Sequence, residues 1–165
     1  MELFCPYVAG KLAPETRAAL EAFAPWTQFV ELPVGDLTAY GRLIRTLWRE
    51  RESFALCEQD VVPTAPQLDE LMECPGEWCT HLYADDRYPD GPMLGLAKFS
   101  AAAMKRWPGA MDDALVVGNR RDIEVSWWEV DARIARDFEI KRLPWCLHDS
   151  RVRHLHTGPL GQGMP

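Results

Sequence analysis

The feature that most constrains the fold is the alternation of two kinds of apolar segment near the start of the chain. Short apolar runs at residues 2–8, 27–32 and 53–57 have the length of strands, while apolar residues recur every three or four positions at 15–23 and 37–49. Strands alternate with helices in this way when helices cover both faces of a parallel sheet. The sequence therefore predicts the α/β class, with a central, mostly parallel sheet flanked by helices.

The rest of the chain continues this alternation less regularly. Asp36 is expected to cap the helix over residues 37–49, and residues 61–63 and 84–92 are expected to be loops. Further segments are predicted as helices at 67–72, 100–107 and 131–138, as strands at 78–83 and 123–128, and as a buried apolar run at 94–99. We expect one domain over residues 1–157, followed by a flexible tail at 158–165 that is rich in Gly and Pro.

The net charge limits the kinds of binding partner, and the cysteine content indicates the cellular compartment. A net charge of −7 disfavours a broad surface for DNA or RNA, although a local basic cleft is permitted. The five cysteines form an odd set, and the sequence has no signal peptide, membrane span or lipidation motif, so we expect a reduced, cytoplasmic protein. Cys74 and Cys79 resemble half a zinc site, but no second Cys/His pair follows at customary finger spacing, so structural zinc is not expected.

The most informative polar segment is the triplet Glu58, Gln59 and Asp60, which directly follows the apolar run at 53–57. On an extended chain Glu58 and Asp60 face one side and Gln59 faces the other, so both carboxylates can reach one ion. Ligands of parallel sheets bind outside the carboxyl ends of the strands, and Mg²⁺ and Mn²⁺ prefer oxygen ligands. The triplet therefore predicts a divalent metal site, the alternative being an ordinary acidic surface turn.

Four segments in the same order resemble GT-A-fold glycosyltransferases, which act on nucleoside diphosphate sugars. They are Phe-Ala-Leu-Cys-Glu-Gln-Asp-Val-Val-Pro-Thr at 54–64, Trp-Cys-Thr-His-Leu-Tyr at 78–83, Gly-Pro-Met-Leu-Gly-Leu-Ala-Lys-Phe-Ser at 91–100 and Arg-His-Leu-His-Thr at 153–157. The resemblance implies a single GT-A-like, Rossmann-like domain of the compact phage or bacterial type. Two departures are Glu-Gln-Asp in place of Asp-x-Asp and the lack of a separate acceptor domain.

The resemblance also implies roles for particular residues. Asp60 is the preferred ligand of Mn²⁺ or Mg²⁺, completed by His154 or His156, and Asp131 or Glu129 is the base that removes the acceptor proton. The residues implied for the nucleotide-sugar are Pro6, Tyr7, Val8, Asp36, Tyr40, Arg42, Glu58, Gln59 and Gly95. Structural alternatives stay open: Tyr40 fits a core, Gly95 a strand bend, Asp131 a helix cap, and either histidine a surface tail.

We therefore expect a metal-dependent glycosyltransferase that moves a sugar, from a UDP-sugar by preference, to a hydroxyl group. The acceptor is left open among carbohydrate, protein and a hydroxylated base of DNA, and an oligomer is compatible with so short a chain. Two other functions compete, namely metal-dependent nucleotidyl transfer or phosphoester hydrolysis, and a non-catalytic module that binds nucleotide-sugars. Glycine-rich phosphate loops and His-Glu-x-x-His are absent from the sequence, which disfavours kinases, dehydrogenases and zinc proteases.

Overall fold

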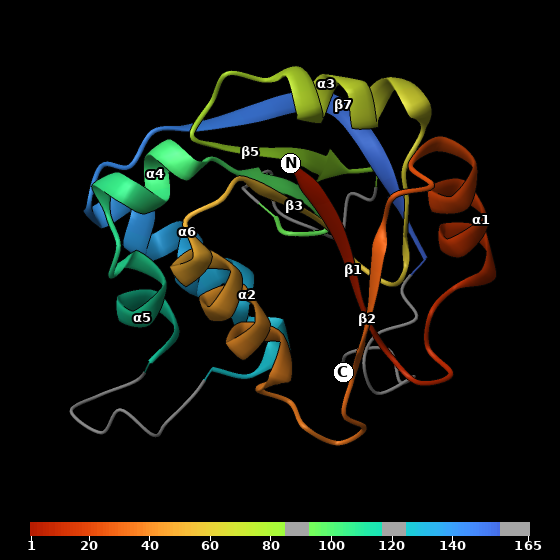
Figure 1. The fold of residues 1–165 in the computed structure, drawn as a ribbon, viewed down its shortest axis with the longest axis horizontal. Coiled ribbons are helices and arrows are strands. Elements are labelled where there is room, and N and C mark those ends of the chain that lie inside the picture. Colours follow the sequence, from red (N-terminus) through yellow and green to blue (C-terminus); the bar gives the residue numbers. More distant parts are fainter. Residues whose placement is uncertain (85–92, 117–124, 156–165) are drawn as a thin grey trace.

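The computed structural model describes residues 1–84, 93–116 and 125–155, in which one sheet lies between two groups of helices (Figure 1). The expected α/β architecture, a central sheet flanked by helices, is confirmed. The predicted loop over 84–92 and the predicted tail at 158–165 fall almost wholly outside the described residues.

The first five elements follow the predicted order, and their bounds differ from the predicted ones by at most two residues. They are β1 (Glu2–Val8), α1 (Pro14–Phe23), β2 (Gln28–Leu32), α2 (Ala39–Glu50) and β3 (Phe54–Cys57). Strand β1 lies between β2 and β3 and is parallel to both. Each of the two helices must therefore cross over the sheet, because parallel neighbours cannot be joined by a tight turn.

The second half of the chain completes the sheet in the order β2-β1-β3-β6-β5-β7-β4. Its elements are β4 (Val61–Val62), α3 (Ala65–Glu73), β5 (Trp78–Tyr83), β6 (Leu96–Phe99), α4 (Ala101–Arg106), α5 (Ala110–Leu115), the 3-10 helix η1 (Trp127–Glu129), α6 (Val130–Ile140) and β7 (Trp145–His154). Strand β6 runs antiparallel to β3 and β5, and β4 runs antiparallel to β7. The remaining five strands point the same way, in agreement with a mostly parallel sheet.

The pairing of β7 with β5 contains one irregularity. His81 of β5 is the register partner of His148, whereas Tyr83 is the partner of Val152. Between these two pairs β7 advances by four positions while β5 advances by two, a register shift that we describe as a β-bulge. The bulge divides β7 into a first part beside β5 and a second part that also pairs with β4.

Each face of the sheet buries its own apolar layer. One layer packs α2, α4, α5 and α6 onto the sheet through aromatic rings, with Phe99 at 5.7 Å from Trp48 and 5.6 Å from Trp78 between ring centroids. The other layer packs α1 and α3 through smaller side chains such as Leu20 and Leu71. In Figure 1, α3 lies above the sheet, whereas α2, α5 and α6 lie below it.

The predicted strand over residues 123–128 is wrong where the structure describes it. The backbone is irregular until it enters η1, and the first two residues of the predicted strand lie outside the described residues. The ring of Trp127 packs on Tyr40 with 4.6 Å between centroids, and the backbone N–H of Trp127 donates to the carbonyl oxygen of Leu37 at 2.8 Å. This tertiary packing overrides the β propensity of the aromatic run. The strand on which Trp127 and Trp128 were expected to alternate is therefore absent, because both residues belong to η1.

Other differences are local. Residues 61–63, expected as a loop, contain β4, and neither its partner β7 nor helix α5 was predicted. Helix α2 begins later than expected, because the carboxylate of Asp36 accepts hydrogen bonds from the backbone N–H and the hydroxyl of Thr38 at 3.1 and 2.9 Å. Asp36 therefore closes a turn ahead of the helix instead of capping it. The predicted cap of α4 is confirmed, since the Ser100 hydroxyl accepts from the N–H of Ala103.

None of the helices in the described part of the chain combines the length and the apolar character needed to cross a membrane.

We predict that Leu56→Ala lowers the free energy of unfolding by about 2–5 kcal/mol, because this side chain is fully buried in β3 and its removal leaves a cavity under α2. Urea denaturation followed by tryptophan fluorescence measures the change. Ile140→Ala is the matched control, since Ile140 is 70% exposed and its truncation should change stability by less than about 0.5 kcal/mol.

Candidate functional site

The candidate site forms around the turn that follows β3. The backbone N–H of Glu58 donates to the carbonyl oxygen of Gly95 at 2.9 Å, and the N–H of Val61 donates back to the carbonyl oxygen of Glu58 at 3.1 Å. The turn places Glu58 and Asp60 in the interior, where they are 8% and 4% exposed. Acidic side chains are rarely buried without a partner, so this burial requires an explanation.

Gln59 points toward the end of β1. Its side-chain Oε1 accepts a hydrogen bond from the N–H of Val8 at 2.9 Å, and its backbone carbonyl accepts one from the N–H of Ala13 at 2.9 Å. The Gln59 amide thereby fixes the turn after β3 against the loop that follows β1.

Strand pairing brings a histidine to the two carboxylates. His154 is the register partner of Val61 in the β4–β7 pair, and its Nε2 lies 3.4 Å from Oδ1 of Asp60. Ligand atoms from Glu58, Asp60 and His154 lie within 4.8 Å of one another, and we call these three residues the ligand group. The second predicted histidine, His156, lies outside the described residues.

Tyr83, which the sequence did not single out, completes the wall of the site. Its ring stacks on His154 with 4.6 Å between centroids, and its hydroxyl donates to Oε2 of Glu58 at 3.3 Å. A Cβ on Gly95 would lie only 2.2 Å from the Tyr83 hydroxyl oxygen, so glycine is required there. The resemblance linked Gly95 to a bound sugar. In the structure, the space that the missing side chain leaves at Gly95 is occupied by the Tyr83 ring. The sequence signals for Tyr83 were its place at the end of a predicted strand and in the family-like segment at 78–83.

Of the two residues predicted as a base, Asp131 is partly buried and its charge acts on Glu58. It is the second residue of α6, whose cap position is Glu129, so the alternative role of Asp131 as a helix cap is wrong. The Asp131 carboxylate instead accepts a hydrogen bond from the N–H of Leu94 at 3.2 Å. The side chain of Glu129 is 45% exposed and lies 3.7 Å from Arg133.

Burial raises the pKa of two carboxyl groups in this region. Burial, then the charges of Asp131 and Asp60, hold the pKa of Glu58 well above its ordinary value. Burial raises the pKa of Asp131 to about 6, against the lowering effects of the Leu94 N–H and of His154. The region thus carries more negative charge than its burial tolerates, and a bound divalent cation would offset it.

The remaining predicted residues line the ends of β1 and α2. Pro6 and Val8 are buried, and the hydroxyl of half-buried Tyr7 donates to Glu31 at 3.1 Å. Tyr40 is fully buried; burial, then the charges of Glu58 and Asp131, raise its pKa. Two further predicted residues, Asp36 and Arg42, form a salt bridge at the start of α2. The Arg42 guanidinium, followed by Thr38, lowers the pKa of Asp36 to about 2.

An open hollow of about 400 Å³ lies at the other end of the sheet, where Glu2 and Phe54 begin β1 and β3. Ligands of sheets with this crossover connection bind at the carboxyl ends of the parallel strands instead. The ligand group, which follows the carboxyl end of β3, is therefore the better candidate for a functional site.

Comparison with known proteins places the fold. No protein-family model matches the sequence, and no curated protein matches it. A solved structure of a glycosyltransferase involved in glycosylation of the major capsid of PBCV-1 superposes with a TM-score of 0.57 at 11% identity, covering 96% of this chain and 95% of that chain. The crystal structure of A197 from STIV superposes with a TM-score of 0.57 at 12% identity, covering 94% of this chain and 86% of that chain. A structure described as a putative glucose-1-phosphate thymidylyltransferase from Bacillus anthracis has a TM-score of 0.46 at 10% identity, covering 92% of this chain and 87% of that chain.

At such low identity the first two similarities show the fold alone. They support the GT-A-like fold that the four sequence segments implied. They also show that the fold occurs in chains of similar length, since both structures are covered almost completely by this one.

We predict that the metal-free protein loses stability as pH rises through about 6, and that Asp131→Asn reduces this loss. The raised pKa means that the folded chain binds the Asp131 proton more tightly than the unfolded chain, so this proton's contribution to stability is complete below pH 3.8 and is lost as pH rises through about 6. At pH 8 the variant should be more stable by roughly 2–3 kcal/mol, the equivalent of a shift of about two pKa units. Urea denaturation in chelator across this pH range provides the measurement, with exposed Asp149→Asn as the control.

Proposed function

We propose that this chain is a metal-dependent glycosyltransferase that moves a sugar from a nucleoside diphosphate sugar, foremost a UDP-sugar, to a hydroxyl acceptor. The observation that carries the proposal is the convergence of Glu58, Asp60 and His154 just beyond β3. The fold adds support, because a similar solved structure is described as a glycosyltransferase. Residues 1–157 form the catalytic domain in this proposal, which we assign to the cytoplasm.

The ligand group suits Mn²⁺ or Mg²⁺ better than a softer metal. It offers two carboxylates and one imidazole, and hard divalent ions favour oxygen donors while leaving positions for water and phosphate. Asp60 and His154 hold the ion in this scheme, and Glu58 is close enough to share it. Such an ion supplies positive charge to the diphosphate as the bond to the sugar breaks.

Asp131 is the proposed base. A carboxyl with a pKa of about 6 is ionised at neutral pH yet basic enough to accept the proton of an acceptor hydroxyl. Leu94 holds this carboxylate through its N–H, which fixes its direction. Glu129 is less suited to the role, because its half-exposed carboxylate lies beside Arg133.

The nucleotide is proposed to lie along the end of β1. Tyr7 offers a ring for the base, and Pro6 and Val8 shape the wall beside it, while Gln59 links this wall to the ligand group. Arg42, paired with Asp36, is the proposed contact for phosphate. Among acceptors, the net charge of −7 favours carbohydrate or protein over DNA.

We predict that Asp60→Asn weakens the manganese-dependent binding of UDP at least about tenfold, or roughly 1.4 kcal/mol, because an amide oxygen is a much poorer ligand than a carboxylate. Isothermal titration calorimetry with UDP, GDP and TDP, with and without Mn²⁺, makes the measurement. Asp69→Asn, on α3, is the control. Nucleotide binding that is the same with and without manganese in the wild type would contradict the proposal.

We predict that Asp131→Asn leaves the affinity for the nucleotide-sugar within about twofold but lowers kcat of transfer by about 10²–10⁴, the usual contribution of a general base. Mass spectrometry of a mixed set of acceptors incubated with the preferred donor identifies the product, and steady-state kinetics gives the ratio. Glu129→Gln is the matched comparison and should retain near wild-type turnover. The opposite ranking of the two variants would transfer the role to Glu129.

A further inference from the structure

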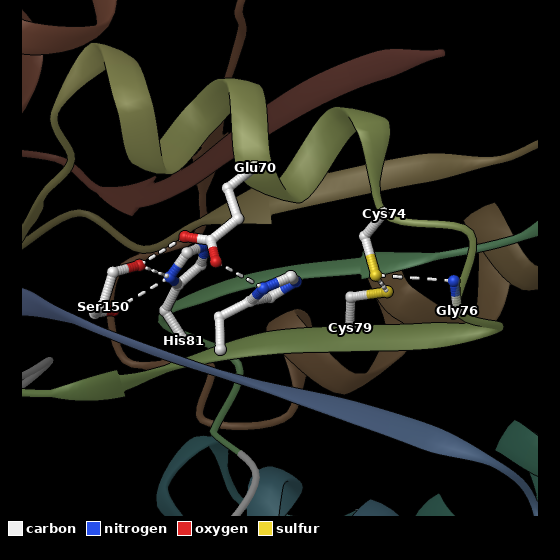
Figure 2. Close-up of polar contacts among 7 residues, drawn as sticks. Glu70, Cys74, Gly76, Cys79, His81 and Ser150 are labelled. Carbon is white, nitrogen blue, oxygen red and sulfur yellow. Dashed lines mark hydrogen bonds and ion pairs between the residues drawn. The ribbon is translucent and has the colours of Figure 1, made fainter.

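A second group of ligating side chains lies under α3, formed by three cysteines and a histidine. Cys74 ends α3, while Cys79 of β5 and Cys146 of β7 are register partners in the parallel pair. The Sγ atoms of Cys79 and Cys74 lie 2.8 Å apart (Figure 2). Ligand atoms of Cys74, Cys146 and His148 lie within 4.8 Å of one another. We call Cys74, Cys79, Cys146 and His148 the thiol cluster.

The strand register explains why these residues meet. Cys146 and His148 are alternate residues of β7, so they face the same side of the sheet, and Cys79 and His81 repeat this arrangement on β5. The rings of His81 and His148 stack with 4.7 Å between centroids. The C-terminal end of α3 brings Cys74 over this face.

His148 is arranged as a metal ligand would be. Its Nδ1 lies 2.9 Å from Oε1 of Glu70, and its side chain is only 10% exposed. Its Nε2 is buried and has no hydrogen-bond partner among the described residues. An unsatisfied buried nitrogen costs free energy, and a carboxylate that holds the other ring nitrogen is the usual outer partner of a metal-bound histidine.

We propose that the thiol cluster binds one structural Zn²⁺ through the three cysteine sulfurs and Nε2 of His148. Three cysteines and one histidine form a standard tetrahedral set for structural zinc. Thiolates do not suit Mg²⁺ or Mn²⁺, so this site and the ligand group differ in the ions they select. Zinc here would join α3, β5 and the first part of β7, the strand that carries His154 at its other end.

The surroundings of the cluster fit this assignment. The N–H of Gly76 donates to Sγ of Cys74 at 3.4 Å, and a Cβ at this glycine would lie 2.7 Å from Sγ of Cys79, so only glycine allows the loop to pass so close to the sulfurs. The buried ammonium of Lys98 donates to the carbonyl oxygen of Cys74. Three thiolates and one zinc ion carry one net negative charge, which this ammonium offsets.

A disulfide between Cys74 and Cys79 explains less of the site. Their separation of 2.8 Å lies between the roughly 2.05 Å of an S–S bond and the roughly 3.8 Å of two sulfurs bound to one tetrahedral Zn²⁺, so the distance alone selects neither. A disulfide would leave Cys146 and the Nε2 atom of His148 without a role. Zinc engages all four members of the cluster.

The test measures zinc content and cobalt spectra of the full chain. Protein expressed with added zinc and purified under reducing conditions should hold one zinc per chain by plasma mass spectrometry. After removal of zinc by chelator, Co²⁺ should give the visible bands of a tetrahedral site and the charge-transfer absorption of thiolate–cobalt bonds. Cys146→Ser and His148→Ala should each weaken zinc binding at least about 100-fold, as measured by competition with a chelating dye.

Three further variants keep the test decisive if a cysteine variant fails to fold. Glu70→Gln leaves all four ligands in place and should weaken zinc about 10–100-fold by loosening His148. Cys5→Ser, which removes a buried cysteine of β1, and Asp60→Asn, in the ligand group, should both keep the thiolate–cobalt absorption. Three outcomes would each overturn the proposal. The first is reduced wild-type protein that shows neither zinc nor thiolate–cobalt absorption. The others are an unchanged zinc affinity in Cys146→Ser and Glu70→Gln, and a Cys74–Cys79 disulfide in the protein as isolated.

Discussion

The burial of two carboxylates in the turn after β3 is the constraint on which the rest of the site depends. Glu58 and Asp60 are held inside by backbone hydrogen bonds at the turn, and Asp131 adds a third, partly buried carboxyl from α6. Desolvation of three acidic groups opposes folding unless protons or cations neutralise them. The surrounding residues accordingly supply a tyrosine hydroxyl to Glu58 and an imidazole to Asp60.

These neighbours come from elements far apart in the sequence, which explains how the fold serves the site. The antiparallel insertion of β6 delivers Leu94 and Gly95 to the same edge as the end of β3, and β5 ends beside them with Tyr83. Pairing of β4 with the end of β7 delivers His154. The sheet therefore assembles one polar region from four strands and the first turn of α6.

The sequence predicted those parts of the structure that depend on local pattern. Apolar periodicity located α1 and α2, and the Glu-Gln-Asp triplet after β3 identified the turn at which the carboxylates gather. Strand β7 was missed because its ten residues are mostly polar and half exposed, so no apolar alternation marks it. The aromatic run at Trp127 was misassigned because its contact with Tyr40, distant in sequence, decides its conformation.

The two groups of polar residues also depend on contacts between residues that are distant in sequence. His154 was placed by resemblance to a family, and its partner Tyr83 could not be identified without the stacking geometry. Spacing related only Cys74 to Cys79, since Cys146 is far along the chain from both and becomes a neighbour of Cys79 only through the parallel register of β5 and β7. Spacing rules detect sites built within one hairpin or helix, and they fail where a sheet brings distant strands together.

The bulge in β7 lets one strand keep two registers, one with β5 and one with β4. Because four residues of β7 span the interval that two residues of β5 occupy, the register of Cys146 and His148 is set against β5, whereas that of His154 is set against β4. Lengthening or shortening this interval would slide the histidine past the acidic turn while the sulfur ligands keep their alignment, so the bulge sets the spacing between the two polar centres.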